Sequence, residues 1–218
     1  MTRHAFEEQM DVLHRKMMTM GTLVEEAIHK SIKSLVERNV QLAEEVIEND
    51  RLINELEHEI ESGCFRVIAL QQPVGNDLRR LGTMLKLVTD LERMGDHAVS
   101  ISKTTRRLMN EEYVKPLIDI PQMADHVKEM VRESLNAYIA RDKEAAEQIA
   151  LKDDVIDKLY STIFKDLLEV MNKNSNSVSQ CTHLLLVAQY LERIADHATN
   201  ICEWIIYMTT GKMTDLNK

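Results

Sequence analysis

The sequence predicts an all-α protein built from two tandem, pseudo-symmetric three-helix bundles, with six long helices in total. Two observations predict this fold class. The 218 residues include only six Gly and three Pro, and aromatic residues make up 4%, a composition that favours helices over sheets. In addition, the motif Leu-Glu-Arg-x-x-Asp-His-Ala occurs at residues 91–98 and again at 191–198, with six identities in eight positions, which indicates an internal repeat.

Each half of the chain contains three segments with apolar residues at helical spacing. In the first half these are about residues 5–38, 41–71 and 76–112. In the second half they are about residues 121–140, 142–172 and 177–210. Residues 116–121, with a proline at each end, form the predicted linker, so we expect domains at 1–115 and 116–218. The short connections within each half imply antiparallel neighbouring helices.

The composition excludes several classes of function. The net charge of −9, without a cluster of Lys and Arg, argues against a nucleic-acid partner, because that binding depends on neutralising phosphates. Three cysteines without a Cys-x-x-Cys pair argue against disulfides or a thiolate zinc site, and favour a reducing compartment. There is no signal-peptide pattern and no apolar stretch long enough to span a membrane. We therefore expect a cytoplasmic protein.

The repeated motif places two carboxylates on one helix face in each half. Glu92 and Asp96 are four residues apart, as are Glu192 and Asp196. Each glutamate continues an apolar stripe, so we expect both to face the seam between helices and to be partly buried. Neighbouring carboxylates in such a place repel each other and are costly to desolvate. A bound cation would offset both effects.

The second helix of each half offers further oxygen groups that interrupt an apolar face. Asp50 and Asn54 correspond to Asp153 and Asp157 at a constant offset of 103 residues, and Asn200 extends the stripe of the last helix. If the second and third helices of a half pack together, these groups converge with the motif carboxylates. Oxygen-rich sets of this kind suit Mg, Mn, Ca or iron.

Other interpretations of the motif remain open. Carboxylates four residues apart are common on solvated helix faces, and Arg93 and Arg193 could pair with carboxylates of neighbouring helices. His97 and His197 lie about 140° around the helix from the glutamates and so should face away from them. The di-iron signature is Glu-x-x-His, whereas here His follows Glu by five positions, which argues against ferritin-like oxidation chemistry. No nucleophile motif or phosphate loop is present, so we do not expect an enzyme.

These residues resemble a known family. Residues 71–79 (Gln-Gln-Pro-Val-Gly-Asn-Asp-Leu-Arg) with 91–98 resemble the first half of a PhoU protein, and residues 190–200 resemble the second half. The resemblance implies two similar three-helix bundles and a homodimer. It implies a cytoplasmic accessory of the phosphate ABC transporter that negatively regulates the phosphate-starvation response. Its partners would be the transporter ATPase subunit and a membrane sensor kinase, so any membrane association would be peripheral and through these partners.

The resemblance also implies a metal cofactor, because some PhoU proteins carry iron or other metal clusters on Glu/Asp-x-x-x-Asp motifs. Carried over, these motifs are Glu92 with Asp96, Glu192 with Asp196, and Asp153 with Asp157. Asn54, and Ser100 in the place of Asn200, depart from the pattern, so we expect weaker metal binding in the first half. The predicted metal is iron or another divalent ion (Zn, Mn or Mg). The alternatives are a carboxylate-ligated metalloenzyme and a metal-free helical adaptor.

Overall fold

Helices account for most of residues 3–216, the part of the chain that the computed structural model describes, and there is no strand within it. The first half forms α1 (Arg3–Glu37), α2 (Val40–Gln71) and α3 (Asn76–Leu108). The second half forms α4 (Asp119–Ala140), α5 (Lys143–Ala150), α6 (Asp153–Lys173), a short 3-10 turn (Ser175–Ser177) and α7 (Val178–Thr210). The predicted all-α class with two tandem three-helix bundles is confirmed. The predicted domains, 1–115 and 116–218, also include residues 1, 2, 217 and 218, which lie outside the described part of the chain.

Local chemistry explains the helix ends. Asn39 caps α2, because its side-chain oxygen accepts a hydrogen bond from the Leu42 amide at 3.0 Å. Gln72 ends the same helix in the left-handed conformation, directly before Pro73. The linker between the halves is residues 109–118, and Pro121 lies in the first turn of α4, where the missing amide proton costs little.

The single helix predicted for residues 142–172 is interrupted in the structure. It is divided into α5 and α6 at Leu151 and Lys152, so the second bundle has its middle helix in two pieces. The apolar periodicity continues across the break, because the buried residues Ile149 and Ile156 are seven positions apart. The break starts α6 with Asp153 and Asp154 in its first turn, where negative charge interacts favourably with the helix dipole.

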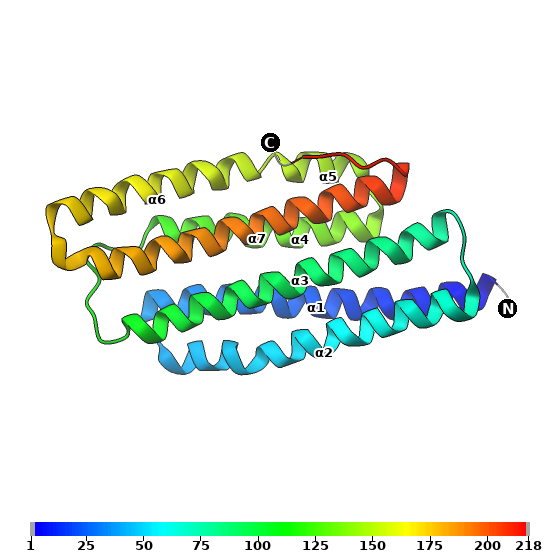
Figure 1. Ribbon diagram of the computed structural model, residues 1–218, viewed down its shortest axis with the longest axis horizontal. Coiled ribbons are helices and arrows are strands. Elements are labelled where there is room, and N and C mark those ends of the chain that lie inside the picture. The colour runs from blue at the N-terminus through cyan, green and yellow to red at the C-terminus, as the bar shows by residue number, and fades with distance from the viewer. Residues whose placement is uncertain (1–2, 217–218) are drawn as a thin grey trace.

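The helices stack in layers, as Figure 1 shows. The helices α5 and α6 form one outer layer, α4 and α7 lie beneath them, then α1 and α3, and α2 forms the opposite outer layer. The two repeats meet where α3 packs against α7 and α1 against α4. Their buried apolar side chains join into one core that runs through both repeats. The repeats therefore form a shared interior, with the two motif helices next to each other.

Close approach between the repeats depends on Gly21. A Cβ atom built on this residue of α1 would lie 2.3 Å from Cδ1 of the buried Leu135 on α4. A side chain at this position would force the buried Leu135 side chain to shift. Gly21 therefore favours the close packing of the two repeats.

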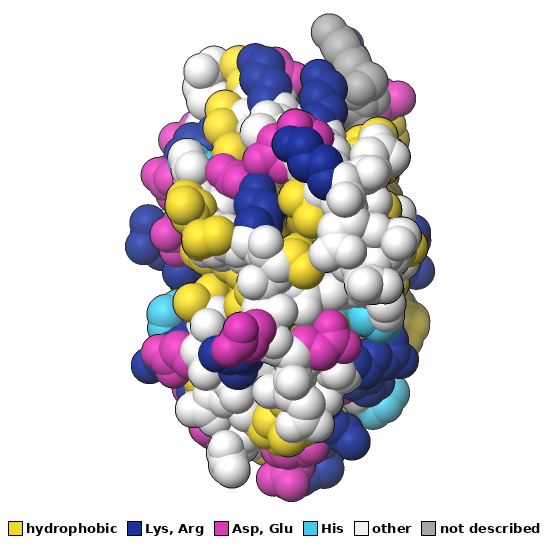
Figure 2. Space-filling model, turned by 90° about the vertical axis from the view of Figure 1, so that its left-hand side faces the viewer, with side chains coloured by type: hydrophobic (Ala, Val, Ile, Leu, Met, Phe, Trp, Pro, Cys, Tyr) yellow, Lys and Arg dark blue, Asp and Glu magenta, His cyan; other side chains and the backbone are white. Residues whose placement is uncertain are grey.

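The surface is of mixed character, and the cysteines lie in the interior. Among the described helices, none combines the length and the apolar composition needed to cross a lipid bilayer. Figure 2 shows acidic, basic and apolar side chains intermixed on the end of the molecule that it faces. Cys64, Cys181 and Cys202 are buried free thiols. Burial raises the pKa of both Cys64 and Cys202 to about 12, so these thiols stay protonated.

Candidate metal centre

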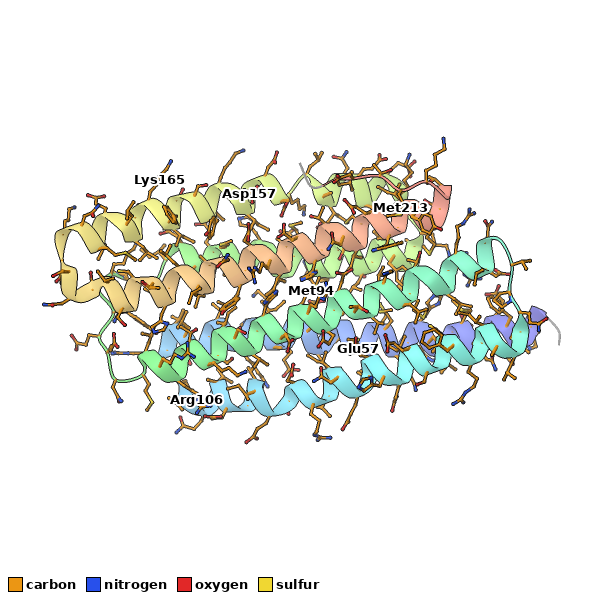
Figure 3. All side chains as sticks on the ribbon, in the orientation of Figure 1. Glu57, Met94, Arg106, Asp157, Lys165 and Met213 are labelled. Carbon is orange, nitrogen blue, oxygen red and sulfur yellow. The ribbon has the colours of Figure 1, made fainter. Side chains whose placement is uncertain are left out.

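The predicted site residues gather into two separate clusters, one in each repeat. Both motif glutamates are half-buried at the edge of the helix seam, while Leu91 and Leu191 beside them are fully buried. The predicted partial burial of Glu92 and Glu192 is thus what the structure shows. The clusters lie on either side of the central α3–α7 pair. Figure 3 marks them by Glu57 on α2, in one outer layer, and Asp157 on α6, in the other.

The second acidic cluster combines α6 and α7. An open pocket of about 430 Å³ has seven lining residues: Asp153, Asp157, Glu192, Arg193, Asp196, His197 and Asn200. All five residues predicted for the second half lie in this pocket. The break between α5 and α6 places Asp153 at the start of a helix that packs directly on α7. The pocket therefore collects four carboxylates and one amide from two helices.

Electrostatic strain is strongest at Asp153. Burial, and then the negative charges of Asp157 and Asp196, raise the pKa of the Asp153 carboxyl to about 7. The Asp153 Oδ1 atom is also buried without a hydrogen-bond partner among the described residues. Burial, followed by repulsion from Asp196, raises the pKa of Glu192 as well. The positive charge of Arg193 lowers the pKa of Glu192 only in part, so burial and carboxylate repulsion dominate in this pocket.

The first acidic cluster combines α2 and α3. Burial, and then repulsion from Asp96, raise the pKa of both Asp50 and Glu92. The Asn54 amide donates to Asp50 Oδ2 at 3.3 Å, which lowers the pKa of Asp50 in part. The other Asp50 oxygen, Oδ1, is buried and has no hydrogen-bond partner in the described part of the chain. A Cβ atom on Gly95 would lie 3.4 Å from it, so Gly95 leaves room for this carboxylate.

Glu57 belongs to the first acidic cluster although the sequence analysis did not identify it. Its negative charge contributes to the raised pKa of Glu92, and that of Asp96 contributes to the raised pKa of Glu57. Glu57 is three residues after Asn54 on the same helix. Comparison of the two repeats does not reveal Glu57, because the residue at the equivalent position, 103 positions later, is Tyr160. The spacing of Asp50, Asn54 and Glu57 at four and then three residues would have found it.

The donor types fit a divalent cation, but the side chains are not arranged around one. In the described part of the protein, no three His, Cys, Asp or Glu side chains come close enough to form a ready metal-binding group. The carboxylate oxygens are nevertheless hard donors of the kind that Mg, Mn or iron prefer. The unpartnered Asp50 and Asp153 oxygens and the raised pKa values mean that a bound cation would stabilise the ionised carboxylates of both clusters. Rotation of exposed side chains such as Asp157 would be required to complete a coordination sphere.

The two motif histidines meet between the clusters. The His97 ring stacks on the rings of His197 and Tyr190, with 5.7 Å between centroids in both cases. Burial, and then the positive charges of His197 and Arg193, lower the pKa of His97 to about 4. Helix geometry predicted that both histidines face away from the glutamates. His197 is nevertheless among the residues that line the open pocket of the second cluster.

Fold and site together define a class: an all-α protein formed by duplication of a three-helix unit, with an acidic cluster in each copy. The family model described as "PhoU domain" matches residues 17–105 and 120–205. The chain therefore belongs to the PhoU family.

Relatives support this assignment over the full length. The chain is 42% identical over 218 residues to the phosphate-specific transport system accessory protein PhoU homolog of Clostridium acetobutylicum, covering 100% of both chains. It is similar to the crystal structure of PhoU from Pseudomonas aeruginosa, with a TM-score of 0.91 at 31% identity, covering 95% of this chain and 100% of that one. It is equally similar to the phosphate transport system regulatory protein PhoU from Streptococcus pneumoniae, with a TM-score of 0.90 at 31% identity, covering 96% and 99%.

Proposed function

We propose that this protein is a cytoplasmic, non-enzymatic regulator of phosphate uptake that represses the phosphate-starvation response when phosphate is plentiful. The observation that carries the proposal is the full-length similarity to a phosphate-specific transport system accessory protein. The name of the solved Streptococcus pneumoniae relative supports a regulatory role. In this role the protein contacts both the ATPase subunit of the phosphate ABC transporter and a membrane-bound sensor kinase, and so reaches the membrane only through them.

We further propose that a divalent metal, iron or else Zn, Mn or Mg, binds the acidic clusters and shapes the contact surface. In the second cluster Asp153, Asp157, Glu192, Asp196 and Asn200 would hold it. In the first cluster Asp50, Glu92 and Asp96 would hold it, and Glu57 would add a fourth carboxylate. The metal would add positive charge between carboxylates that repel each other. It would leave the fold unchanged and order side chains at the surface.

A pull-down tests the partner assignment. Tagged protein is recovered from phosphate-replete cells, and co-purifying proteins are identified by mass spectrometry. We expect the transporter ATPase subunit and the sensor kinase with wild type, and a reduced yield of one or both with the double variant Glu192→Gln, Asp196→Asn. Glu55→Gln is the matched control, because Glu55 is exposed on α2 and pairs with Arg51 outside both clusters. Recovery of neither partner with wild type would contradict the proposal.

Metal content and assembly are tested on protein purified without chelator. We expect elemental analysis to find bound divalent metal in wild type and less in the Glu192→Gln, Asp196→Asn variant. Light scattering should give the mass of a homodimer, which the family resemblance implies. Substrate turnover by the metal-loaded protein would instead support the metalloenzyme alternative, and full activity in cells without metal would support the metal-free adaptor.

A further inference from the structure

A buried acidic residue of the first repeat, Asp90, reaches into the second acidic cluster. Asp90 lies on α3 and is only 7% exposed. Its Oδ1 atom lies 2.9 Å from His197 Nδ1 and accepts a hydrogen bond from the Asn200 amide at 3.4 Å. His197 and Asn200 both line the pocket of the second cluster on α7. The pocket is therefore supported by a side chain that belongs to the other repeat.

Within residues 3–216 the first cluster has no equivalent contact, although the fold is pseudo-symmetric. The residue at the place of Asp90 is Tyr190, which stacks on His97 and offers no carboxylate. The residue at the place of Asn200 is Ser100, and its hydroxyl donates to the Asp96 carbonyl of its own helix at 3.0 Å. The link across the repeats therefore serves only one of the two clusters.

The bond to Asp90 fixes the His197 ring. An ionised carboxylate can only accept a hydrogen bond, so the imidazole donates and carries a proton on Nδ1. In the neutral ring, Nε2 is then the unprotonated nitrogen, which is free to bind a metal. Among the described residues, Nε2 of His197 has no hydrogen-bond partner. Metal-binding histidines commonly donate their other ring nitrogen to a carboxylate in this manner, which sets the tautomer and the ring orientation.

We infer that Asp90 is a positioning residue for the second acidic cluster: it holds His197 so that Nε2 serves as an additional ligand for a divalent cation bound there. The second site is then built by both repeats, whereas the first consists of carboxylates from its own repeat. This inference rests on the proposed metal binding and adds a nitrogen ligand to a set that is otherwise made of oxygens. It also gives the two pseudo-equivalent sites different chemistry.

The test isolates the second cluster and uses Mn²⁺ as the probe. In a background with Asp50→Asn, Glu57→Gln, Glu92→Gln and Asp96→Asn, which removes all four carboxylates of the first cluster, Mn²⁺ binding measured by electron paramagnetic resonance reports on the second cluster. We expect Asp90→Ala to weaken Mn²⁺ binding by about 10- to 100-fold, the usual effect of losing such a partner. Asp90→Asn should recover part of this loss, because its amide oxygen can still accept from Nδ1. Tyr190→Leu, at the equivalent position of the other repeat, should change the affinity less than about twofold.

A second readout, ¹⁵N shifts of the His197 ring in metal-free protein, separates positioning from general support of the fold. We expect the proton on Nδ1 in wild type and a shift toward the Nε2-protonated form in Asp90→Ala. An unchanged tautomer overturns the inference, and so does a changed tautomer with unchanged Mn²⁺ affinity. If wild type binds Mn²⁺ and Asp90→Ala binds it equally well, only this inference fails. If wild type binds no Mn²⁺, Zn²⁺ or Fe²⁺, the proposed metal binding fails and this inference falls with it.

Discussion

Replacing Asp153 with Asn removes a carboxyl group that is unfavourable when it is ionised in the metal-free protein. Burial and repulsion raise its pKa from 3.8 to about 7, so the folded protein binds this proton more tightly than the unfolded chain does. Stability of the metal-free protein therefore falls as the pH rises from about 4 to about 7, and the loss is complete above that range. The Asn side chain is neutral throughout and avoids this loss.

The magnitude follows from the size of the shift. A shift of about three pH units at about 1.4 kcal/mol per unit gives an upper bound of about 4 kcal/mol. Because Asp153 is only partly buried, solvent screening reduces this value, and we expect about 1–2 kcal/mol. Loss of a negative charge from the first turn of α6 offsets about 0.3–1 kcal/mol of the gain. The net expectation is that Asp153→Asn is more stable than wild type by about 1 kcal/mol at pH 8.

Urea denaturation with a chelator present, repeated between pH 4 and pH 8, measures this difference. The advantage of Asp153→Asn should shrink toward zero at the acidic end. Asp154→Asn is the comparison variant, because Asp154 occupies the same helical turn but is exposed, lies outside the pocket, and contributes less to the raised pKa of Asp153 than Asp157 or Asp196 does. Loss of its favourable interaction with the helix dipole and relief of its weak repulsion of Asp153 oppose each other, so its stability should differ from wild type by less than that of Asp153→Asn. If Asp153→Asn is destabilised at pH 8, or if its advantage does not depend on pH, the electrostatic account of the cluster is wrong.

Three further predictions concern packing, capping and metal. Gly21→Ala should lower the free energy of unfolding in urea by about 1–3 kcal/mol, because its Cβ would meet Leu135. Gly82→Ala has nothing within 4 Å of its Cβ and should raise that free energy by up to about 1 kcal/mol. Equal effects of the two substitutions would contradict the packing argument. Asn39→Ala removes the cap of α2 and should cost about 0.5–2 kcal/mol in the same assay, and no loss would show that the cap is dispensable. Saturating Mn²⁺ should raise the melting temperature of wild type more than that of Asp153→Asn, and an equal rise in differential scanning calorimetry would argue against binding at this cluster.

Much of the fold could be predicted because the helical periodicity is regular and the chain is duplicated. The repeat placed Glu92 and Glu192 correctly at equivalent, half-buried positions. The break at Leu151 could not be predicted, because the apolar spacing continues through it. Ser177 directly precedes α7, but its side chain does not cap this helix, because its hydroxyl donates to the Asn174 carbonyl at 2.6 Å instead. Such a local turn has no periodic signal.

The candidate site was predictable only where both halves carry the same chemistry. Glu57 has no acidic counterpart in the second half, so comparing the halves could not find it. The role of Asp90 depends on contact between α3 and α7, which brings it next to His197 from the other repeat. A pattern within one helix predicts which residues share a face, but not which helix will pack against that face. Asp90 therefore needed the structure, whereas Glu57 could have been found from its helical spacing after Asp50 and Asn54.

The most direct measurement of the proposed function is the expression of a phosphate-starvation reporter during phosphate excess. In a strain lacking the gene, we expect the reporter to stay on, and wild-type protein to switch it off. The variant with Glu192→Gln and Asp196→Asn should fail to switch it off, while Glu55→Gln should act as wild type. If the reporter is already off in the strain lacking the gene, the protein is not the proposed negative regulator.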